Sequence, residues 1–481
     1  MKKSANLIWF RQDLRVQDNP ALNHAIEDGA PLIAIYLHNK DDSTQWALGE
    51  ASKVFLNEAL QSLENSLSNL GIKLQFIESQ NYLKSIQSLT RELNITKVFW
   101  NRLYEPDFVE RDKLIKSKLT EASVEVHTFK GALLWEPWEI LQDSGKPYQV
   151  FTPFYKKCLK ASYPILPLTS KKKVHGLKSA SAQNLESFEL LSKLSWVKTL
   201  KNHWNVSESD AFKMLHNFIE KNLYDYESQR NNPSIIGTSK MSPFLHFGVI
   251  SPRQIWHELQ KVKNSKGRET YEKEIVWREF AHHLIFHFPK TPDNPLRTEF
   301  ENFPWEKNNK NFKLWTQGLT GFPIVDAGMR ELWETGWMHN RVRMIVASFL
   351  IKDLRIHWLK GAKWFWDTLV DADLASNTLG WQWSAGCGAD AAPFFRIFNP
   401  TTQSEKFDPE GLYIRKWVPE LKNVPSKFIH APHELSPIEQ RTYNCILGKD
   451  YPFPIVDHKL AREEALKAFK ILSRSKKLRK D

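Results

Sequence analysis

The segment Asn6-Leu-Ile-Trp-Phe10 is the first of five short apolar runs that decide the fold of the N-terminal part of the chain. The other runs cover residues 31–37, 74–77, 98–100 and 124–129, and each has the length and composition of a buried strand. A helix is predicted over 47–70, where leucines recur at every third or fourth residue before Gly71: Leu56, Leu60, Leu63, Leu67 and Leu70. Alternating strands and helices predict a doubly wound, parallel α/β sheet.

This part of the sequence lacks the usual phosphate-binding loops. Neither GxGxxG nor GxxxxGK[ST] occurs in it, so the glycine-rich loops that bind dinucleotides or nucleoside triphosphates are not expected. A ligand of such a sheet would lie at the carboxyl ends of its strands.

The later sequence divides the chain further. Periodicity fades over 131–200, which contains several prolines and a basic run, Lys171-Lys-Lys173. After Asn202 a helical pattern resumes without a convincing alternating strand. We therefore predict an α/β domain at 1–130, an interdomain connector at 131–200, a large all-α domain at 201–472 and a solvated basic tail at 473–481.

Composition limits the class of protein. The 481 residues are 41% hydrophobic and 25% charged, which is typical of a folded globular protein. The net charge of +12 favours an anionic partner and leaves open nucleic acid, a membrane surface or an acidic ligand. No signal-peptide apolar region and no run of about 18 apolar residues occurs, so we expect a cytoplasmic protein without a membrane partner.

Cysteine and tryptophan usage add two constraints. The three cysteines lie far apart without a CxxC pair, so neither a disulfide framework nor a cysteine-based zinc site is supported, and a reducing compartment fits best. Of the 19 tryptophans, six precede residue 200 and thirteen follow it. A large helical core would explain any one of them, but the clustering in the second half calls for a functional reason as well.

The first candidate site combines Tyr226-Glu-Ser-Gln-Arg230 with Gly237-Thr-Ser-Lys-Met-Ser-Pro243, which leads into an apolar helix. Hydroxyls and free backbone N–H groups at a helix start can bind an anion such as a phosphate. An ordinary N-cap explains the same residues, and both interpretations stay open.

The second candidate site is a predicted helix with Glu274, Trp277 and Arg278 at spacings of three and four residues. A carboxylate beside an indole ring could read the polar edge of a base that stacks on the ring. An ion pair beside a core tryptophan explains the pattern equally well. Histidines follow at positions 282, 283 and 287, but no HExxH motif or acidic third ligand accompanies them, so we expect no metal site.

Two further segments carry polar residues in apolar surroundings. One helical turn would contain Asn340, Arg341, Arg343 and Met344. These residues suit either a surface that binds an aromatic ligand and phosphates or the solvent-exposed face of an amphipathic helix. The segment from Asp371 to Trp383 contains two carboxylates, Asn377 and two indoles. Carboxylates and amides are rarely buried in a hydrophobic core, so this segment favours a functional site. It has too few oxygen ligands for a calcium loop.

Together these motifs resemble the photolyase and cryptochrome family, and within it the photolyases for cyclobutane pyrimidine dimers. The resemblance spans nearly the whole chain and includes Trp9-Phe-Arg-Gln-Asp-Leu-Arg15, Asp18-Asn-Pro20, Gly237 to Pro243, Trp277-Arg-Glu-Phe280, Trp337-Met-His-Asn-Arg341 and Asp371 to Trp383. It implies an α/β antenna-chromophore domain followed by a helical domain that binds FAD and damaged DNA, with the dimer flipped into a cavity.

The resemblance also implies roles for individual residues. FAD would be bound by Tyr226, Thr238, Ser239, Lys240, Met241, Ser242, Asn340, Asp371, Asp373 and Asn377. The catalytic pocket around the dimer would be formed by Glu274, Trp277, Asn340, Met344, Asn377 and Trp383. DNA would be contacted by Arg230, Glu274, Trp277, Arg278, Asn340, Arg341 and Gln403.

The implied activity is that of a light-driven lyase in DNA repair. Excited, reduced flavin donates an electron to the dimer, the cyclobutane bonds open and the electron returns, so the cofactor supplies the reactivity and the protein supplies position and polarity. Glu274 would stabilise the dimer anion by hydrogen bonding. Trp381, Trp358 and Trp305 match the family's electron-transfer chain from the protein surface to the flavin.

Several choices within the family rest on single residues. Plant cryptochromes typically carry Asp where Asn377 stands, and the enzymes for (6-4) photoproducts usually carry His where Asn340 stands, so repair of cyclobutane dimers is favoured. The alternatives are a cryptochrome-type blue-light photoreceptor without repair activity and a repair enzyme that prefers single strands. The sequence also lacks a long C-terminal signalling extension.

The identity of the second chromophore and the oligomeric state are also expectations. The segment Trp100-Asn-Arg-Leu-Tyr-Glu-Pro-Asp107 departs from the contact pattern of one folate-binding branch and is closer to the branch near plant cryptochromes. We expect methenyltetrahydrofolate as the antenna, with a deazaflavin as the alternative, and assign no antenna residue. We expect the protein to be a monomer.

Overall fold

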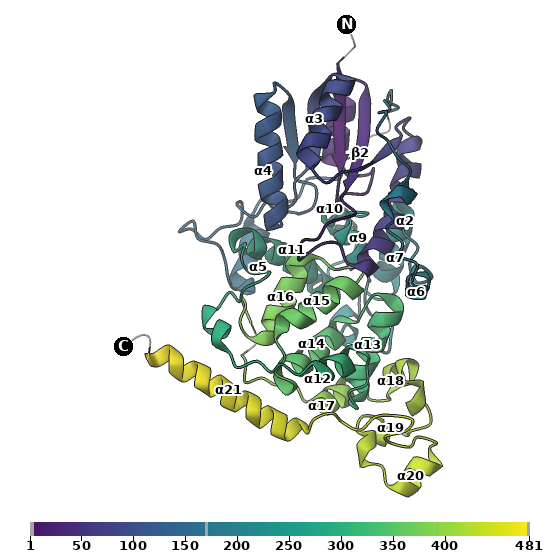
Figure 1. Cartoon of the computed structure of the whole chain (residues 1–481), viewed down its shortest axis with the longest axis vertical. Helices are drawn as coiled ribbons and strands as arrows, with labels where there is room; N and C mark the ends of the chain where they lie inside the picture. Colours follow the sequence, from purple (N-terminus) through teal and green to yellow (C-terminus); the bar gives the residue numbers. More distant parts are fainter. Residues whose placement is uncertain (1–3, 169–171, 392, 479–481) are drawn as a thin grey trace. The chain divides into compact units, whose positions relative to one another are not determined.

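The structure is a computed structural model that describes residues 4–168, 172–391 and 393–478 (Figure 1). Its contacts divide the chain into two compact units. The sheet-containing unit comprises Met1–Tyr224, Ser239–Pro289 and Val370–Asp373, and the helical unit comprises Asp225–Thr238, Lys290–Leu369 and Leu374–Asp481. Each unit therefore contains segments that lie far apart in the sequence.

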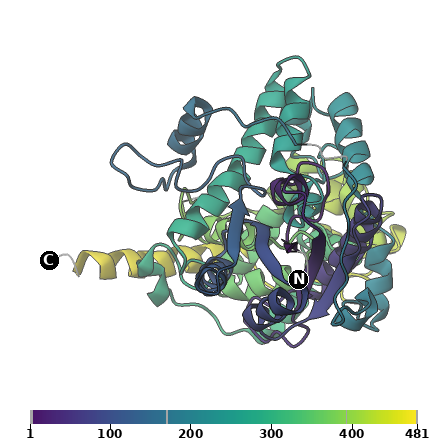
Figure 2. The same ribbon diagram turned by 90° about the horizontal axis from the view of Figure 1, so that it is seen from above.

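The sheet-containing unit is built on a five-stranded parallel sheet with the order β3-β2-β1-β4-β5. The strands are β1 (Ala5–Phe10), β2 (Leu32–His38), β3 (Leu74–Glu78), β4 (Ile95–Asn101) and β5 (Glu125–Phe129). Helices flank the strands on both faces (Figure 2). The predicted doubly wound sheet is confirmed, and each predicted strand overlaps one of these five.

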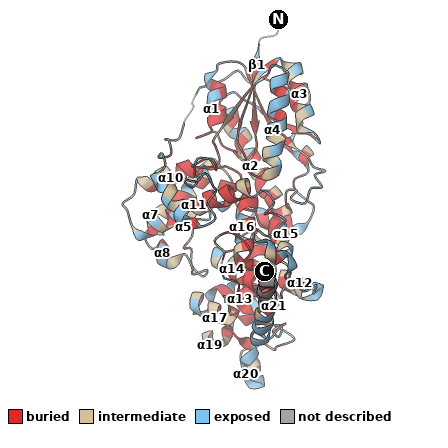
Figure 3. Cartoon of the chain, turned by 90° about the vertical axis from the view of Figure 1, so that its left-hand side faces the viewer, coloured by how far each residue is buried: buried red, intermediate tan, exposed pale blue. Residues whose placement is uncertain are grey.

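The central strand β1 is buried on both faces and is apolar apart from Asn6. All six residues of β1 are buried, as Figure 3 shows in red. Its odd-numbered residues share a core with Ile86 and Leu89 of α3 (Tyr82–Leu93) and with Ile115 and Leu119 of α4 (Pro106–Glu121). The helix α1 (Pro20–Glu27) packs against β1, β4 and β5, which covers the sheet further.

The helix predicted over 47–70 is α2 (Glu50–Ser68), and Gly71 has a φ of +80° after it. The remaining helices of this unit are α5 (Phe151–Lys160), η1 (Leu185–Phe188), α6 (Ser195–Lys201), α7 (Glu208–Lys221), α9 (Ser242–His246), α10 (Pro252–Gln260) and α11 (Lys266–His287). The predicted connector at 131–200 thus contains α5, η1 and most of α6. The basic run at 171–173 lies partly outside the described residues, and the predicted domain boundaries stay predictions.

The helical unit fits the predicted all-α pattern. Its helices are α8 (Tyr226–Gln229), η2 (Thr298–Asn302), α12 (Asn309–Thr316), α13 (Pro323–Thr335), α14 (Asn340–Ser348), η3 (Phe349–Asp353), α15 (Trp358–Thr368), α16 (Leu374–Ala385), α17 (Pro400–Phe407), α18 (Leu412–Trp417), η4 (Pro419–Leu421), α19 (Ser426–Ile429), η5 (Pro432–Glu434), α20 (Pro437–Thr442) and α21 (His458–Leu478). Over the described residues of this unit, β-bridges are isolated and no strand forms.

The last helix extends beyond residue 472, where the helical pattern was expected to end. Residues 473–478, which we expected in a solvated tail, continue α21 to Leu478, and residues 479–481 lie outside the described part of the chain. The sequence here contains Lys, Arg and Leu, which are good helix formers, and has no Gly or Pro to end the helix. Across the described ranges, no helix combines the length and apolar character needed to span a bilayer.

Candidate functional site

Two of the predicted phosphate-binding residues, Tyr226 and Thr238, belong to the helical unit. Tyr226 begins α8 and is buried, and the guanidinium carbon of Arg230 lies 5.4 Å from the centre of its ring. Gly237 packs so closely on this helix that a Cβ there would lie 3.0 Å from the Gln229 carbonyl oxygen. Thr238 follows and is half-buried. The backbone of the loop is therefore fixed against α8.

The next four residues belong to the sheet-containing unit. The Tyr271 hydroxyl lies 2.8 Å from the buried Ser239 Oγ, which accepts a hydrogen bond from the Met241 N–H. Lys240 adopts a left-handed φ of +52°, and Ser242 is the exposed first residue of α9. No side-chain hydrogen bond caps α9. The ordinary N-cap that we kept as an alternative is thus not observed at this helix.

The helix predicted around Glu274, Trp277 and Arg278 is α11, so the three side chains occupy adjoining positions. The Trp277 ring stacks on Phe151 with 3.7 Å between ring centres and 5° between planes, and it stays half-buried. Arg278 donates from Nη1 to the Ala132 carbonyl at 2.7 Å. Phe151 therefore fixes the orientation of the Trp277 ring and occupies one of its two faces.

The histidines of α11 contact protein groups. His283 Nε2 accepts from the Tyr148 N–H at 3.0 Å, so its Nδ1 carries the proton directed at the Pro137 carbonyl. Burial lowers the pKa of His283 to about 4, which keeps its ring neutral. Over the described residues, no group of three or more His, Cys, Asp or Glu side chains is arranged to hold a metal ion.

Asp371 and Asp373 are both buried in the sheet-containing unit. Asp373 Oδ2 lies 3.4 Å from His282 Nε2 and 3.9 Å from His246 Nδ1. Burial alone would raise the pKa of Asp373, but these imidazoles and Arg278 hold it well below its ordinary value. Asp373 is therefore an ionised acceptor inside the protein, which suits the N–H and hydroxyl groups of a flavin.

In the helical unit, Asn340 is the exposed first residue of α14, with Met344 half-buried one turn later. Arg341 donates to Asn231 Oδ1 at 2.7 Å, and its guanidinium carbon lies 4.4 Å from the centre of the Phe407 ring. Like charge from Arg230 and, chiefly, partial burial lower the pKa of Arg341. The positive charges of Arg341 and Arg230 therefore influence each other, which favours an anion.

Gln403 lies on α17, one turn before Phe407, and is half-buried. Because Arg341 stacks on Phe407, the structure places α17 beside this arginine within the helical unit. The predicted DNA-contacting residues of this unit are therefore gathered from α8, α14 and α17.

Asn377 and Trp383 are half-buried on α16. Asn377 donates from Nδ2 to the Ala362 carbonyl at 3.0 Å, so its amide orientation is set and its Oδ1 remains an acceptor. A neutral amide in this position can orient a ligand but has no acidic proton to deliver.

The three tryptophans of the predicted electron-transfer chain all lie in the helical unit. Trp381 and Trp358 are buried and Trp305 is half-buried. The His357 ring lies 5.1 Å from Trp305 and 5.6 Å from Trp358. A Cβ on Gly361, in the first turn after Trp358, would lie 2.1 Å from Trp381. The first two members of the predicted order, Trp381 and Trp358, are thus fully buried, and only the last, Trp305, is partly exposed.

Two buried residues that the sequence analysis did not predict, His246 and Glu105, belong to the sheet-containing unit that holds Asp373. His246 ends α9 beside Asp373, and Glu105 is a buried carboxyl that follows β4 by four residues. Its position at the carboxyl end of a parallel strand is the signal that could have drawn attention to Glu105. His282 was considered only as a metal ligand, whereas the structure pairs it with Asp373.

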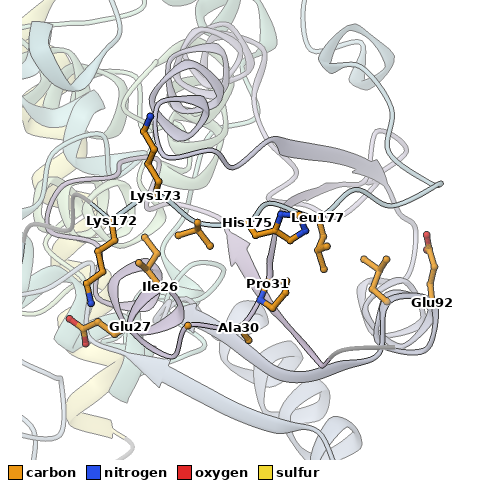
Figure 4. A pocket seen from close by; sticks show the side chains of 12 residues that line it. Ile26, Glu27, Ala30, Pro31, Glu92, Lys172, Lys173, His175 and Leu177 are labelled. Carbon is orange, nitrogen blue, oxygen red and sulfur yellow. The ribbon is translucent and has the colours of Figure 1, made fainter. Parts of the chain in front are cut away.

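A separate cavity of about 850 Å³ opens at the other end of the sheet, where β2 begins (Figure 4). Its lining includes Pro31, Glu92, Lys173 and His175. It contains none of the predicted site residues, so it does not serve the site described above.

Comparison with known proteins extends these findings. Residues 6–172 match the family described as DNA photolyase, and residues 271–471 match the FAD binding domain of DNA photolyase. A deoxyribodipyrimidine photo-lyase of Agrobacterium fabrum is 44% identical, with 98% of each chain covered. Cryptochrome-2 of Arabidopsis thaliana is 39% identical, with 96% of this chain and 78% of the relative covered.

A solved structure agrees with this relationship. The bacterial class III photolyase from Agrobacterium tumefaciens superposes with a TM-score of 0.94 at 43% sequence identity, and 98% of each chain is covered. Near-complete coverage at this identity extends the likeness from the sheet to the last helices. The chain therefore belongs to the photolyase and cryptochrome family.

Proposed function

We propose that this protein is a deoxyribodipyrimidine photo-lyase that uses light to repair cyclobutane pyrimidine dimers in DNA. The observation that carries the proposal is the 44% identity to a deoxyribodipyrimidine photo-lyase over nearly the full length of both chains. The surroundings of single candidate residues support it, because Asp373 is an ionised buried acceptor, Trp277 is an indole held by a ring stack, and Arg341 is held by Asn231 and Phe407.

The donor set fits FAD. Tyr226 and the segment Thr238, Ser239, Lys240, Met241 and Ser242 would bind the phosphates, and Asp371, Asp373, Asn340 and Asn377 would bind the ribityl chain and the isoalloxazine. The bound flavin would supply light absorption and a transferable electron. Because Asp373 is buried and ionised, it would accept a hydrogen bond from an N–H or O–H of the cofactor without donating one.

The pocket for the dimer would be formed by Glu274, Trp277, Met344 and Trp383, together with Asn340 and Asn377. Trp277 would contribute a flat surface whose orientation Phe151 fixes, and prior fixing lowers the entropy lost on stacking. Glu274 would hydrogen-bond the base edge. Met344 would supply an apolar, adaptable contact.

Binding of damaged DNA would depend on phosphate contacts. Arg230, Arg278, Arg341 and Gln403 are the proposed contacts, and the net charge of +12 supports attraction to a polyanion. Asn231 and Phe407 hold the Arg341 guanidinium in place within the helical unit. Oriented in this way, it could bond two phosphate oxygens at once.

Trp381, Trp358 and Trp305 would carry electrons toward the flavin. The ordering from two buried indoles to a half-buried one supports a path from the protein interior to solvent. The closely packed rings around His357 support short steps between the outer members.

A cryptochrome-type photoreceptor is the second candidate, favoured by the 39% identity to cryptochrome-2. Asn377 opposes it, because a neutral amide cannot protonate the flavin as the aspartate of plant cryptochromes can. Absence of repair by protein that holds reduced FAD would favour this second candidate.

The antenna, assembly and location are part of the same proposal. Methenyltetrahydrofolate is the proposed antenna and a deazaflavin the alternative; the absorption spectrum of the chromophore extracted from purified protein distinguishes them. We propose a cytoplasmic monomer, and light scattering during size-exclusion chromatography would measure its mass.

The decisive experiment is illumination of the purified, reduced protein with an oligonucleotide that carries one thymine dimer. Light-dependent recovery of thymine absorbance, absent in the dark, is expected. Trp277→Leu should repair more slowly, whereas Trp138→Leu should not, because that indole is 46% exposed and is outside the proposed pocket. No recovery in light, with FAD bound and reduced, would contradict the proposal. Comparing duplex and single-stranded substrates would establish strand preference.

A further inference from the structure

The indole of Trp305, the outermost member of the proposed electron path, is positioned by ring packing. It is half-buried in the helical unit, and its Nε1 is buried without a hydrogen-bond partner. Between ring centres, Phe303 lies 4.4 Å and His357 5.1 Å from this indole. Because no hydrogen bond anchors the ring of Trp305, its position depends on packing against these neighbours.

The His357 ring connects Trp305 with Trp358. Its centre lies 5.6 Å from that of Trp358 with 28° between the planes, and 5.1 Å from that of Trp305 with 62° between the planes. Within the described part of the helical unit, no ring contact joins Trp305 directly to Trp358. The imidazole is therefore the ring that both indoles contact.

The backbone brings these rings together from two segments of the chain. Glu306 and Ile356 form an isolated β-bridge, and the Glu306 N–H donates to the Arg355 carbonyl at 2.8 Å. Arg355 also donates from Nη2 to Glu306 Oε1 at 2.7 Å. Glu306 directly follows Trp305, and Ile356 directly precedes His357. The paired backbones therefore hold the indole and the imidazole close to each other.

A hydrogen bond to the backbone sets the orientation and the proton of His357. This residue is the N-cap of α15, and its Nδ1 accepts from the Leu359 N–H at 3.1 Å. A ring nitrogen that accepts carries no proton, so the proton of this imidazole lies on Nε2. Burial, followed by the charge of Lys360, lowers the pKa of His357, which agrees with this assignment. The ring that contacts both indoles is therefore uncharged at neutral pH.

We propose that His357 is a positioning residue of the electron path, which holds Trp305 near Trp358 and bridges the two indoles. The proposal rests on the proposed function, because the path serves a bound flavin. In the step concerned, Trp305 loses one electron and an oxidised Trp358 gains it. An added thiol then returns one electron to Trp305.

An uncharged aromatic ring suits this step for two reasons. Electrons tunnel faster through packed atoms than across a gap, and the imidazole packs against both indoles. An imidazolium would instead repel the positive charge that each indole carries while it is oxidised. Removal of the ring should therefore slow the transfer from Trp305 to Trp358.

Two variants separate the ring of His357 from its role as a helix cap. His357→Asn removes the ring but keeps a good N-cap residue. His357→Phe keeps an aromatic ring but has no acceptor for the Leu359 N–H. His433→Asn is the matched control, because His433 is an exposed histidine of η5 in the same unit.

The test is transient absorption of the purified protein with bound FAD, which follows how long an oxidised tryptophan survives after a laser flash. The wild type and His433→Asn should give a long-lived signal from Trp305. His357→Asn should lose this component, because an electron returns more quickly to an indole nearer the flavin. His357→Phe should keep the component, although it should unfold at lower urea than His357→Asn.

Two results would overturn the proposal. One is a long-lived signal in His357→Asn equal to that of the wild type. The other is a loss in His357→Phe as complete as that in His357→Asn, because an aromatic ring would then not suffice. Should His357→Asn not fold, loss of the signal in His357→Phe still overturns the proposal, and its retention supports it.

Trp305→Phe separates this inference from the proposed function. This variant should lose the long-lived component whether or not His357 has a role. If it keeps the component, the proposed electron path fails and the present inference fails with it. If it loses the component while His357→Asn keeps it, only the present inference fails. A purified protein that binds no FAD would overturn both the proposed function and this inference.

Discussion

Gly361 allows a direct test of how Trp381 is packed. This glycine lies in the first turn of α15 within the helical unit, and a Cβ there would lie 2.1 Å from Trp381 Cη2 and 2.7 Å from Leu350 Cδ2. Carbon atoms cannot approach so closely, and Trp381 is 2% exposed, so its ring cannot swing into solvent. Gly361→Ala must therefore displace the indole or the helix.

The magnitude follows from two opposing effects. Overpacking of a dense core typically costs about 1–3 kcal/mol. Replacing a glycine in a helix interior by alanine contributes about 0.5–1 kcal/mol of stability. Gly380 in α16 is the matched control, because a Cβ there meets nothing within 4 Å. Gly380→Ala should gain the helix contribution alone, so the two variants should differ by about 1–3 kcal/mol.

Urea unfolding followed by circular dichroism measures this difference, and the rate of light-driven flavin reduction reports on the indole. Gly361→Ala should unfold at lower urea than Gly380→Ala and should reduce its flavin more slowly. If Gly361→Ala is as stable as Gly380→Ala, Trp381 does not pack against this glycine and the reasoning is wrong.

Three other predictions follow from the site. Trp381→Phe should block light-driven reduction of bound flavin but leave repair by chemically pre-reduced protein largely intact; unchanged flavin absorbance kinetics would remove Trp381 from the path. Affinity for dimer-containing duplex should fall with salt, and Arg341→Gln should reduce the slope of log affinity against log salt by about 1; equal slopes in a titration series would argue against a phosphate contact. Burial raises the pKa of the Glu279 carboxyl from 4.5 to about 7. Between these two pH values the native state therefore binds more protons than the unfolded state, and the free energy of unfolding should fall as the pH rises through this range. Glu279→Gln should flatten that fall in pH-dependent unfolding, and parallel curves would contradict it.

The sequence determined the local elements well. Five apolar runs overlap the five strands. The pattern is clearest for the central strand β1, which is buried along its whole length, because a parallel strand buried on both faces must be largely apolar. The spacing of Glu274, Trp277 and Arg278 likewise predicted their shared helix, since helical neighbours are set by chain periodicity. The exception was the end of α21, where residues 473–478 have good helix propensity despite their polar, basic character.

The tertiary structure decided which groups meet. The stack of Phe151 on Trp277 joins residues 126 positions apart, and the pair of His282 with Asp373 joins residues 91 positions apart. No periodicity links such residues, because their distance depends on how whole helices pack. The charge states of Glu105 and Asp373 also depend on burial and on these distant partners, so two carboxyls of similar intrinsic acidity have pKa values displaced in opposite directions.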